Sequence, residues 1–147
     1  MSPAELKQYL HEHIPLSRAM EVSVIAVGED AVILRAPLAP NINHRETVFG
    51  GSASAVAILS AWSLVHTRLR REGIACRIVI QRNTMEYDRP IWGDFTARAS
   101  LEQAGEWQRF THLLAQKGKA RIAVTAMLEH SGRVVGRFRG EFVALGA

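Results

Sequence analysis

The stretch from Asn41 to Ser52 reads Asn-Ile-Asn-His-Arg-Glu-Thr-Val-Phe-Gly-Gly-Ser and runs directly into a long apolar segment. It combines polar side chains with two adjacent glycines, Gly50 and Gly51, which free the backbone where the apolar segment begins. The first N–H groups of a helix have no partner inside the helix and carry partial positive charge. A helix start here can receive an anion or the developing oxyanion of a carbonyl, so we expect the active site at this point.

The segment that follows, residues 52–71, is predicted to be a helix buried on nearly all sides. Its apolar residues spread around most of the helix circumference: Ala53, Val56, Ala57, Leu59, Ala61, Trp62, Leu64 and Val65. A helix that is apolar all round belongs in a core. Ser52 suits the N-cap position and Gly73 the position just after the helix.

The remaining pattern is mostly strand. Ser2, Pro3 and Glu5 form a helix-start signal for a short N-terminal helix, which Pro15 ends. Strands are predicted at 21–27, 31–38, 77–87, 95–101, 121–130 and 134–145, with a short helix at 107–114. Six strands with one long helix do not alternate as a doubly wound sheet requires. We therefore expect one α+β domain, residues 1–147, in which a mostly antiparallel sheet curls around the long helix.

A single curled sheet leaves one face and one edge to be covered. Pairing with a second copy of the chain covers both, so we expect a homodimer or a dimer of dimers.

The composition is that of an ordinary globular protein. The chain has 147 residues, 48% of them hydrophobic and 22% charged, with a net charge of +4. The charge shows no basic arm and no nucleic-acid-binding motif is present, so nucleic acid is not the expected partner. Cys76, the only cysteine, excludes an internal disulfide and offers no metal cluster. The polar start and short apolar runs predict neither a signal peptide nor a membrane span, and we expect a cytoplasmic protein.

Three short motifs carry a resemblance to a known family. The first is Asn43, Thr47 and Phe49-Gly50-Gly51, the second is Tyr87-Asp88-Arg89-Pro90 with Gly93-Asp94, and the third is the basic glycine turn Lys117-Gly118-Lys119-Ala120-Arg121. In these motifs the chain resembles the hotdog-fold thioesterases that act on acyl-CoA and acyl carrier protein, with Phe49 in place of the His of the bacterial thioesterase motif. The combination is most similar to the thioesterase-like domain that follows an acetyltransferase domain in some bacterial proteins.

The resemblance implies a hotdog fold with about six antiparallel strands around one central helix, and hydrolysis of an acyl thioester. No separate cofactor is implied, because coenzyme A or phosphopantetheine is part of the substrate. The reaction needs a polarised carbonyl and an oriented water. The Gly51 N–H and the Asn43 amide are candidates for the carbonyl, and His44 or Glu46 for the water. The alternatives are turn formation by Asn43 and solvated loop roles for His44 and Glu46.

Other residues are candidates for holding the substrate. Phe49 and Gly50 adjoin the expected carbonyl site, although Phe49, like Trp62 and Trp107, also suits a core. A group of basic residues is a candidate for the phosphates of the substrate, with a solvated hairpin as the alternative: Lys117, Lys119 and Arg121.

One position departs from the pattern of these thioesterases. Many of them carry an Asp or Glu on the central helix where this chain has Ile58. Isoleucine cannot act as a base or nucleophile, so an acid has to come from elsewhere. Ile58 therefore favours a second hypothesis, a non-catalytic acyl-thioester-binding or scaffold domain. Ser60 and Ser63 have no evident His–acid partner, and Asp88 and Asp94 are interpreted as turn residues.

Overall fold

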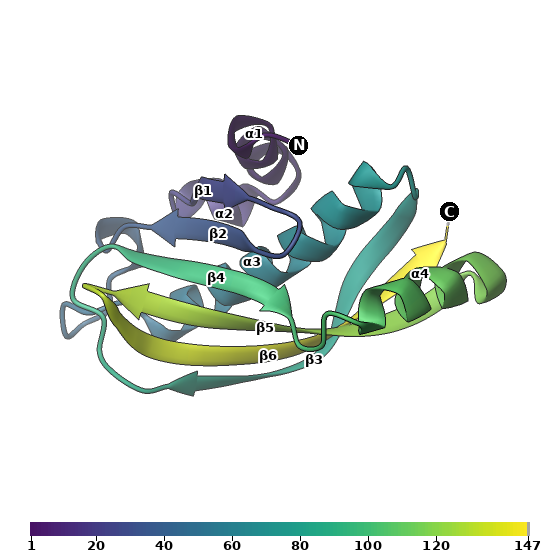
Figure 1. The fold of residues 1–147 in the computed structure, drawn as a ribbon. Coiled ribbons are helices and arrows are strands. Elements are labelled where there is room, and N and C mark those ends of the chain that lie inside the picture. Colours follow the sequence, from purple (N-terminus) through teal and green to yellow (C-terminus); the bar gives the residue numbers. More distant parts are fainter. Residues whose placement is uncertain (147) are drawn as a thin grey trace.

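The long helix lies in the hollow of a curled six-stranded antiparallel sheet, as Figure 1 shows. The computed structural model describes residues 1–146. Its helices are α1 (Pro3–His13), α2 (Pro15–Ala19), α3 (Gly50–Arg71) and α4 (Glu106–Lys117), with one 3₁₀ turn at Ala39–Asn41. Its strands are β1 (Ser23–Val27), β2 (Val32–Ala36), β3 (Cys76–Tyr87), β4 (Phe95–Leu101), β5 (Lys119–His130) and β6 (Arg133–Gly146). The α+β class, six strands, central helix and short N-terminal helix are confirmed.

The strands lie in the order β1-β2-β4-β5-β6-β3. The edge strand β3 follows α3 in the chain but pairs with the last strand, β6. This crossover brings the end of β3 beside the start of α3 and the β5–β6 hairpin at one end of the molecule, on the left in Figure 1. The elements that form the candidate site therefore come from distant parts of the sequence.

Helix α3 is positioned by burial of its apolar side chains. Val56, Leu64 and Val65 have no solvent exposure, and even Ser60 and Ser63 are fully buried. Each fully buried Val or Leu side chain contributes about 1.5–3 kcal/mol relative to an exposed one. Its 22 residues span about 33 Å.

The start of α3 differs from the prediction in two respects. The helix begins at Gly50, two residues before the predicted start, and its N-cap is Phe49, which has no side-chain capping bond. The prediction that Ser52 caps the helix is wrong, because Ser52 already lies inside the first turn. At the other end the helix closes at Glu72, and Gly73 takes φ +72°, as predicted.

The N-terminal capping box is confirmed. The Ser2 hydroxyl accepts a bond from the Glu5 N–H at 3.1 Å, and the Glu5 carboxylate accepts one from the Ser2 N–H at 3.0 Å. Pro15 ends α1 as predicted, and it also begins a second short helix, α2, which the sequence pattern did not indicate. Leu6 and Leu10 bury α1 against the core.

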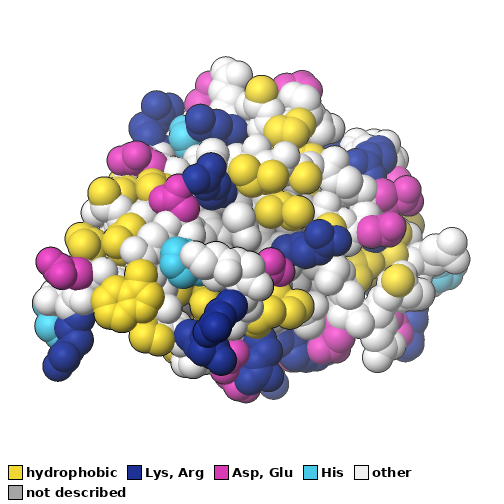
Figure 2. Space-filling model, turned by 60° about the vertical axis from the view of Figure 1, so that its left-hand side comes forward, with side chains coloured by type: hydrophobic (Ala, Val, Ile, Leu, Met, Phe, Trp, Pro, Cys, Tyr) yellow, Lys and Arg dark blue, Asp and Glu magenta, His cyan; other side chains and the backbone are white. Residues whose placement is uncertain are grey.

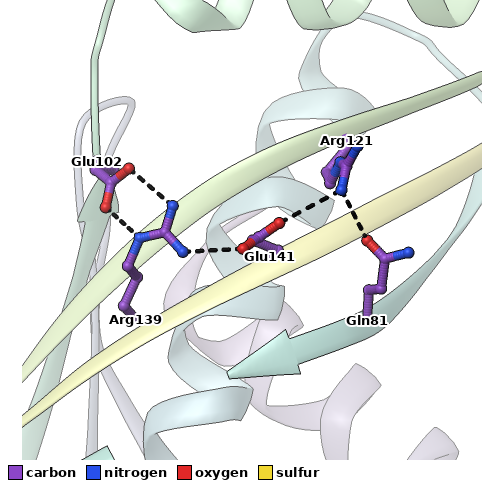
Figure 3. Close-up of polar contacts among 5 residues, drawn as sticks. All are labelled: Gln81, Glu102, Arg121, Arg139 and Glu141. Atoms are coloured by element: carbon purple, nitrogen blue, oxygen red, sulfur yellow. Dashed lines mark hydrogen bonds and ion pairs between the residues drawn. The ribbon is translucent and has the colours of Figure 1, made fainter. Parts of the chain in front are cut away.

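The outer face of the sheet is polar. Arg139 of β6 binds the Glu102 carboxylate through two nitrogens and the Glu141 carboxylate at 3.0 Å (Figure 3). Glu141 also lies 3.6 Å from Arg121 of β5, which in turn bonds to Gln81 of β3 at 3.3 Å. In one chain this face therefore presents charged side chains that pair with one another, and its cover by a second copy stays a prediction.

The edge strand β3 is different. Its outer edge has no strand partner within residues 1–146, and three large apolar side chains along it are exposed: Val79, Ile80 and Tyr87.

Of the described helices, none is long and apolar enough to cross a membrane.

The Arg139 network predicts an acid-dependent loss of stability. Hydrogen bonding to Arg139 holds the pKa of Glu102 and of Glu141 below their ordinary value of 4.5. The unfolded chain therefore takes up protons at a higher pH than the folded chain, and the stabilisation is present above about pH 4.5 and lost as the pH falls through the folded pKa values. The free energy of unfolding, measured by urea unfolding at several pH values, should fall less steeply below about pH 4.5 in Arg139→Gln than in the wild-type protein. An equal dependence on pH in the two proteins would contradict a role of Arg139 in this loss.

Candidate active site

The loop before α3 is organised by the side chain of Asn43. Its Oδ1 accepts bonds from the N–H groups of Arg45, at 2.8 Å, and Thr47, at 3.1 Å. Its Nδ2 donates to the Thr47 hydroxyl at 2.9 Å, and its backbone N–H donates to the Thr47 carbonyl at 2.8 Å. Both ends of the amide are thus used within the loop. The turn-forming role weighed for Asn43 is the role the geometry displays, and a direct role on substrate stays a prediction.

The loop is held against the body of the protein at three points. The Phe49 N–H donates to the Asn41 carbonyl, the Val48 N–H to the Ile91 carbonyl, and the Asn41 amide to the carbonyls of Met20 and Pro37. Asn41 is buried, and it is a positioning residue that the sequence reading missed. A buried Asn beside a proline is not distinguishable from a turn Asn by sequence alone.

Two backbone donors stand free at the helix start. The Phe49 carbonyl accepts from the N–H groups of Ser52, at 2.9 Å, and Ala53, at 3.1 Å. The N–H groups of Gly50 and Gly51 have no hydrogen-bond acceptor within residues 1–146. Gly51 is exposed, so these donors, with the partial positive charge of a 22-residue helix behind them, are open to an incoming oxygen atom.

Aromatic rings flank both glycines. A Cβ atom on Gly51 would lie 2.4 Å from the Phe49 ring, and one on Gly50 would lie 3.4 Å from the Tyr87 ring. Position 51 thus excludes side chains while the Phe49 ring keeps its place, whereas position 50 accepts a methyl group. Phe49 and Tyr87 are each 59% exposed, so the core alternative weighed for Phe49 is wrong and the two rings form the rim of the site.

An apolar pocket of about 310 Å³ opens beside Gly50. It lies between the start of α3, the end of β3 with the segment after it, and the β5–β6 hairpin. Its walls are apolar and its mouth carries polar groups; the lining residues are Val48, Gly50, Ala53, Met85, Tyr87, Asp88, Arg89, Pro90, Ile91, Leu128, Val135 and Gly136. Ligand pockets of about 300–1,000 Å³ with apolar walls and a few polar groups are typical of small-molecule sites. Figure 2 views this side of the molecule, where hydrophobic side chains gather in small groups among charged ones.

Asp88 is the carboxylate that lines this pocket in the described chain. The Arg137 guanidinium binds both of its oxygens, at 2.9 and 3.2 Å, and also reaches Glu86 at 2.8 Å. The bond to Arg137 holds the pKa of Asp88 below its ordinary value, so the carboxylate is ionised at neutral pH. The sequence reading treated Asp88 as a turn residue and did not place it at the site.

The two residues predicted to orient water lie on the exposed part of the loop. His44 and Glu46 are exposed, and Glu46 adopts φ +65°, a conformation uncommon for a residue with a side chain. Neither lines the pocket, and neither side chain makes a hydrogen bond within residues 1–146. Their catalytic role stays a prediction.

The predicted phosphate-binding residues lie at the far end of the sheet. Lys119 is at the start of β5, whereas Leu128 near its end lines the pocket. Nine residues of strand separate them by roughly 30 Å. Arg121 is bound to Glu141 and Gln81, and Lys117 ends α4. Within one chain these residues are not brought to the pocket, so a phosphate role would require a second copy.

Several weighed residues are core or remote from the pocket. Trp107 is buried and Trp62 is half-buried, its ring N–H donating to the Ile78 carbonyl. The buried Ser60 hydroxyl donates back to the Ala57 carbonyl, within its own helix. Burial raises the pKa of the Cys76 thiol, which lies at the opposite end of β3 from Tyr87. Within residues 1–146, no three His, Cys, Asp or Glu side chains are grouped as a metal site requires.

Comparison with known proteins identifies the family. Residues 3–146 match the family described as "Putative thioesterase (yiiD_Cterm)", and the chain belongs to this family. The expected family is therefore confirmed.

Solved structures extend the similarity to the whole fold. A protein of unknown function from Chlorobaculum tepidum is 30% identical, with a TM-score of 0.93 over 99% of this chain and 98% of that one. A "putative thioesterase" from Shewanella oneidensis is 24% identical, with a TM-score of 0.83 over 97% and 96% of the chains. A thioesterase from Haemophilus influenzae is 14% identical, with a TM-score of 0.79 over 99% and 92%. The latter two show the shared hotdog fold alone.

The Asn43 network predicts a stability effect. Asn43→Ala removes the acceptor of two backbone N–H groups, one exposed and one half-buried, and a typical hydrogen bond contributes about 0.5–1.5 kcal/mol to stability. Urea unfolding should therefore show a loss of this size. Asn43→Asp is the matched control, because it keeps the acceptor and should lose less. Equal stability of Asn43→Ala and wild type would contradict the organising role.

Proposed function

We propose that the protein hydrolyses an acyl thioester of coenzyme A or acyl carrier protein. The observation that carries this proposal is the pair of unpaired N–H groups at Gly50 and Gly51, of which Gly50 lines an apolar pocket. Membership of a thioesterase family supports it. Such a site would hold the carbonyl oxygen of a thioester at the helix start and its acyl chain in the pocket.

The chemistry follows from this placement. A water molecule attacks the carbonyl carbon and loses a proton to a base, while the carbonyl oxygen becomes an oxyanion. The N–H groups of Gly50 and Gly51 stabilise that oxyanion together with the helix dipole. The oxyanion then reforms the carbonyl and the C–S bond breaks. The thiolate takes up the proton held by the base and leaves as a thiol, and the carboxylic acid that remains loses its proton to solvent to give the carboxylate.

The water is oriented by His44 or Glu46 in this proposal, since both stand on the loop that ends at Gly50. An imidazole nitrogen can accept a proton from water, so His44 suits a base. Asp88, which is ionised and lines the pocket, is a further acceptor, although Arg137 already engages both of its oxygens. Asn43 acts through the loop, by keeping the helix start in place.

A second candidate function is binding of acyl thioesters without hydrolysis. Ile58 favours it, because this half-buried side chain packs against the core where many related thioesterases carry an acid. Thiol release from a panel of acyl-CoAs distinguishes the two functions. Saturable binding without thiol release by the wild-type protein would replace the first function with the second.

We further propose that the protein acts as a dimer formed along β3. The free edge of this strand and its exposed Val79 and Ile80 side chains support an edge-to-edge pairing with a second copy. In an antiparallel pairing the start of one β3 lies beside the end of the other. The partner would then border the mouth of the pocket at Tyr87.

Substitution at Gly50 tests the oxyanion donor. Gly50 is the first residue of α3, where proline is tolerated, and Phe49 at φ −59° and ψ 132° has the conformation a residue before proline prefers. Gly50→Pro therefore removes one N–H with little strain. It should lower kcat about 10²–10³-fold, whereas Gly50→Ala, which keeps the N–H, should stay within a few-fold of wild type. Thiol release measures both, and equal rates for the two variants would exclude the Gly50 N–H as a donor.

Sedimentation equilibrium tests the dimer. The wild-type protein should sediment at about twice its chain mass of 16.3 kDa. Val79→Lys should shift it toward the monomer, because a charge at the strand edge opposes pairing. Met127→Lys, at an exposed position of the interior strand β5, is the control and should leave the mass unchanged. A stable monomer at micromolar concentration would contradict the proposal.

A further inference from the structure

One side of the pocket is formed by a row of three residues across three neighbouring strands. Tyr87 of β3, Gly136 of β6 and Leu128 of β5 are register partners, and all three line the pocket. Tyr87 and Leu128 contribute side chains to its walls. Gly136 contributes none, so the depth of the pocket at the centre of the row depends on the absence of a side chain there.

The backbone does not require glycine at this position. The described glycines with positive φ are Gly73, Gly118 and Gly132, and Gly136 is not among them. Glycine inside a strand weakens it by roughly 0.5–1 kcal/mol relative to alanine. The presence of glycine at position 136 is therefore explained by the side chains and the pocket that face it, and not by its backbone conformation.

That space is bounded by Met85. A Cβ atom on Gly136 would lie 2.9 Å from the methyl carbon of Met85, 3.2 Å from the Glu86 carbonyl oxygen and 3.6 Å from the Leu128 Cβ. The closest neighbour is the flexible end of a methionine, which moves at little cost, and methionine adapts its shape to fill irregular spaces. At this point the pocket is bounded by the bare backbone of Gly136 and by the flexible side chain of Met85 that faces it.

We propose that Gly136 and Met85 together set the length of the acyl chain that the pocket accepts. This inference rests on the proposed function, in which the carbonyl lies at Gly50 and the chain enters the pocket. A pocket of about 310 Å³ lies at the lower end of the range for small-molecule sites, so the substrates in this proposal are acyl thioesters of short to medium chain length. An added methyl group at position 136 shortens the accepted chain, and removal of the Met85 side chain lengthens it.

Two variants with opposite expected effects test the inference. The rate constant kcat/KM is measured for wild type, Gly136→Ala and Met85→Ala on straight-chain acyl-CoAs from two to sixteen carbons. Gly136→Ala should lose about 10-fold or more on the longest chain that wild type accepts, because one methylene in a hydrophobic pocket changes kcat/KM about 10–200-fold. Met85→Ala should shift the preference toward longer chains. Met127→Ala, a methionine exposed at an outward position of β5, is the matched control and should leave the profile unchanged.

Binding of non-hydrolysable acyl-CoA thioethers, measured by calorimetry on the same proteins, separates this inference from the proposed function. A shifted binding profile without any hydrolysis by wild type would contradict the enzymatic function and support the length-setting role. Hydrolysis with an unchanged chain-length profile in both variants would overturn the length-setting role alone. Absence of both binding and hydrolysis on the wild-type protein would overturn both proposals. Thermal unfolding of each variant verifies that it is folded, and the Met85→Ala arm stands if Gly136→Ala does not fold.

Discussion

Burial of α3 in the hollow of the sheet is the constraint on which the rest of the structure depends. A 22-residue helix that is apolar on most sides has one stable place, the hollow of the sheet, where it contacts strands β2 to β6. Once it lies there, its first turn has to emerge at one end of the sheet, beside the end of β3 and the β5–β6 hairpin. The free N–H groups of Gly50 and Gly51 and the apolar pocket are consequently neighbours.

Two polar residues of the loop, Asn41 and Asn43, hold this geometry in place. The amide oxygen and the amide nitrogen of Asn43 both make hydrogen bonds within the loop. The Asn41 amide donates to the Met20 carbonyl outside the loop. These bonds hold the segment that leads into the first turn of α3. The loop therefore contributes to catalysis in our proposal chiefly through position, while the backbone supplies the charge stabilisation.

Local signals in the sequence predicted much of the fold. The capping box at Ser2, the glycine after α3 and the all-round apolar pattern of the helix each depend on neighbours within one or two turns. The helix start was misplaced at Ser52 because a serine is a good cap wherever it stands, whereas the real N-cap, Phe49, is held by a bond to Asn41 and has no capping side chain.

The site was only partly predictable from the sequence, because part of it is formed by contacts between distant segments. Gly50 and Gly51 were found from the helix-start pattern. The pocket was not, because Tyr87, Gly136 and Leu128 meet only through the register of three strands from distant segments. The same register separates Lys119 from the pocket, although the basic turn had been read as part of one site. Spacing along a chain does not reveal which end of a strand faces which end of a helix.

The most direct measurement of the central claim is the response of the backbone amides to a bound thioester analogue. Two-dimensional ¹H–¹⁵N NMR of the full chain, titrated with a non-hydrolysable acyl-CoA ketone, reports each N–H group separately. The account predicts that the largest shifts fall on Gly50 and Gly51, in the direction of stronger hydrogen bonding, with smaller shifts at Tyr87 and Gly136. Saturable binding that leaves the Gly50 and Gly51 amides unmoved would contradict it.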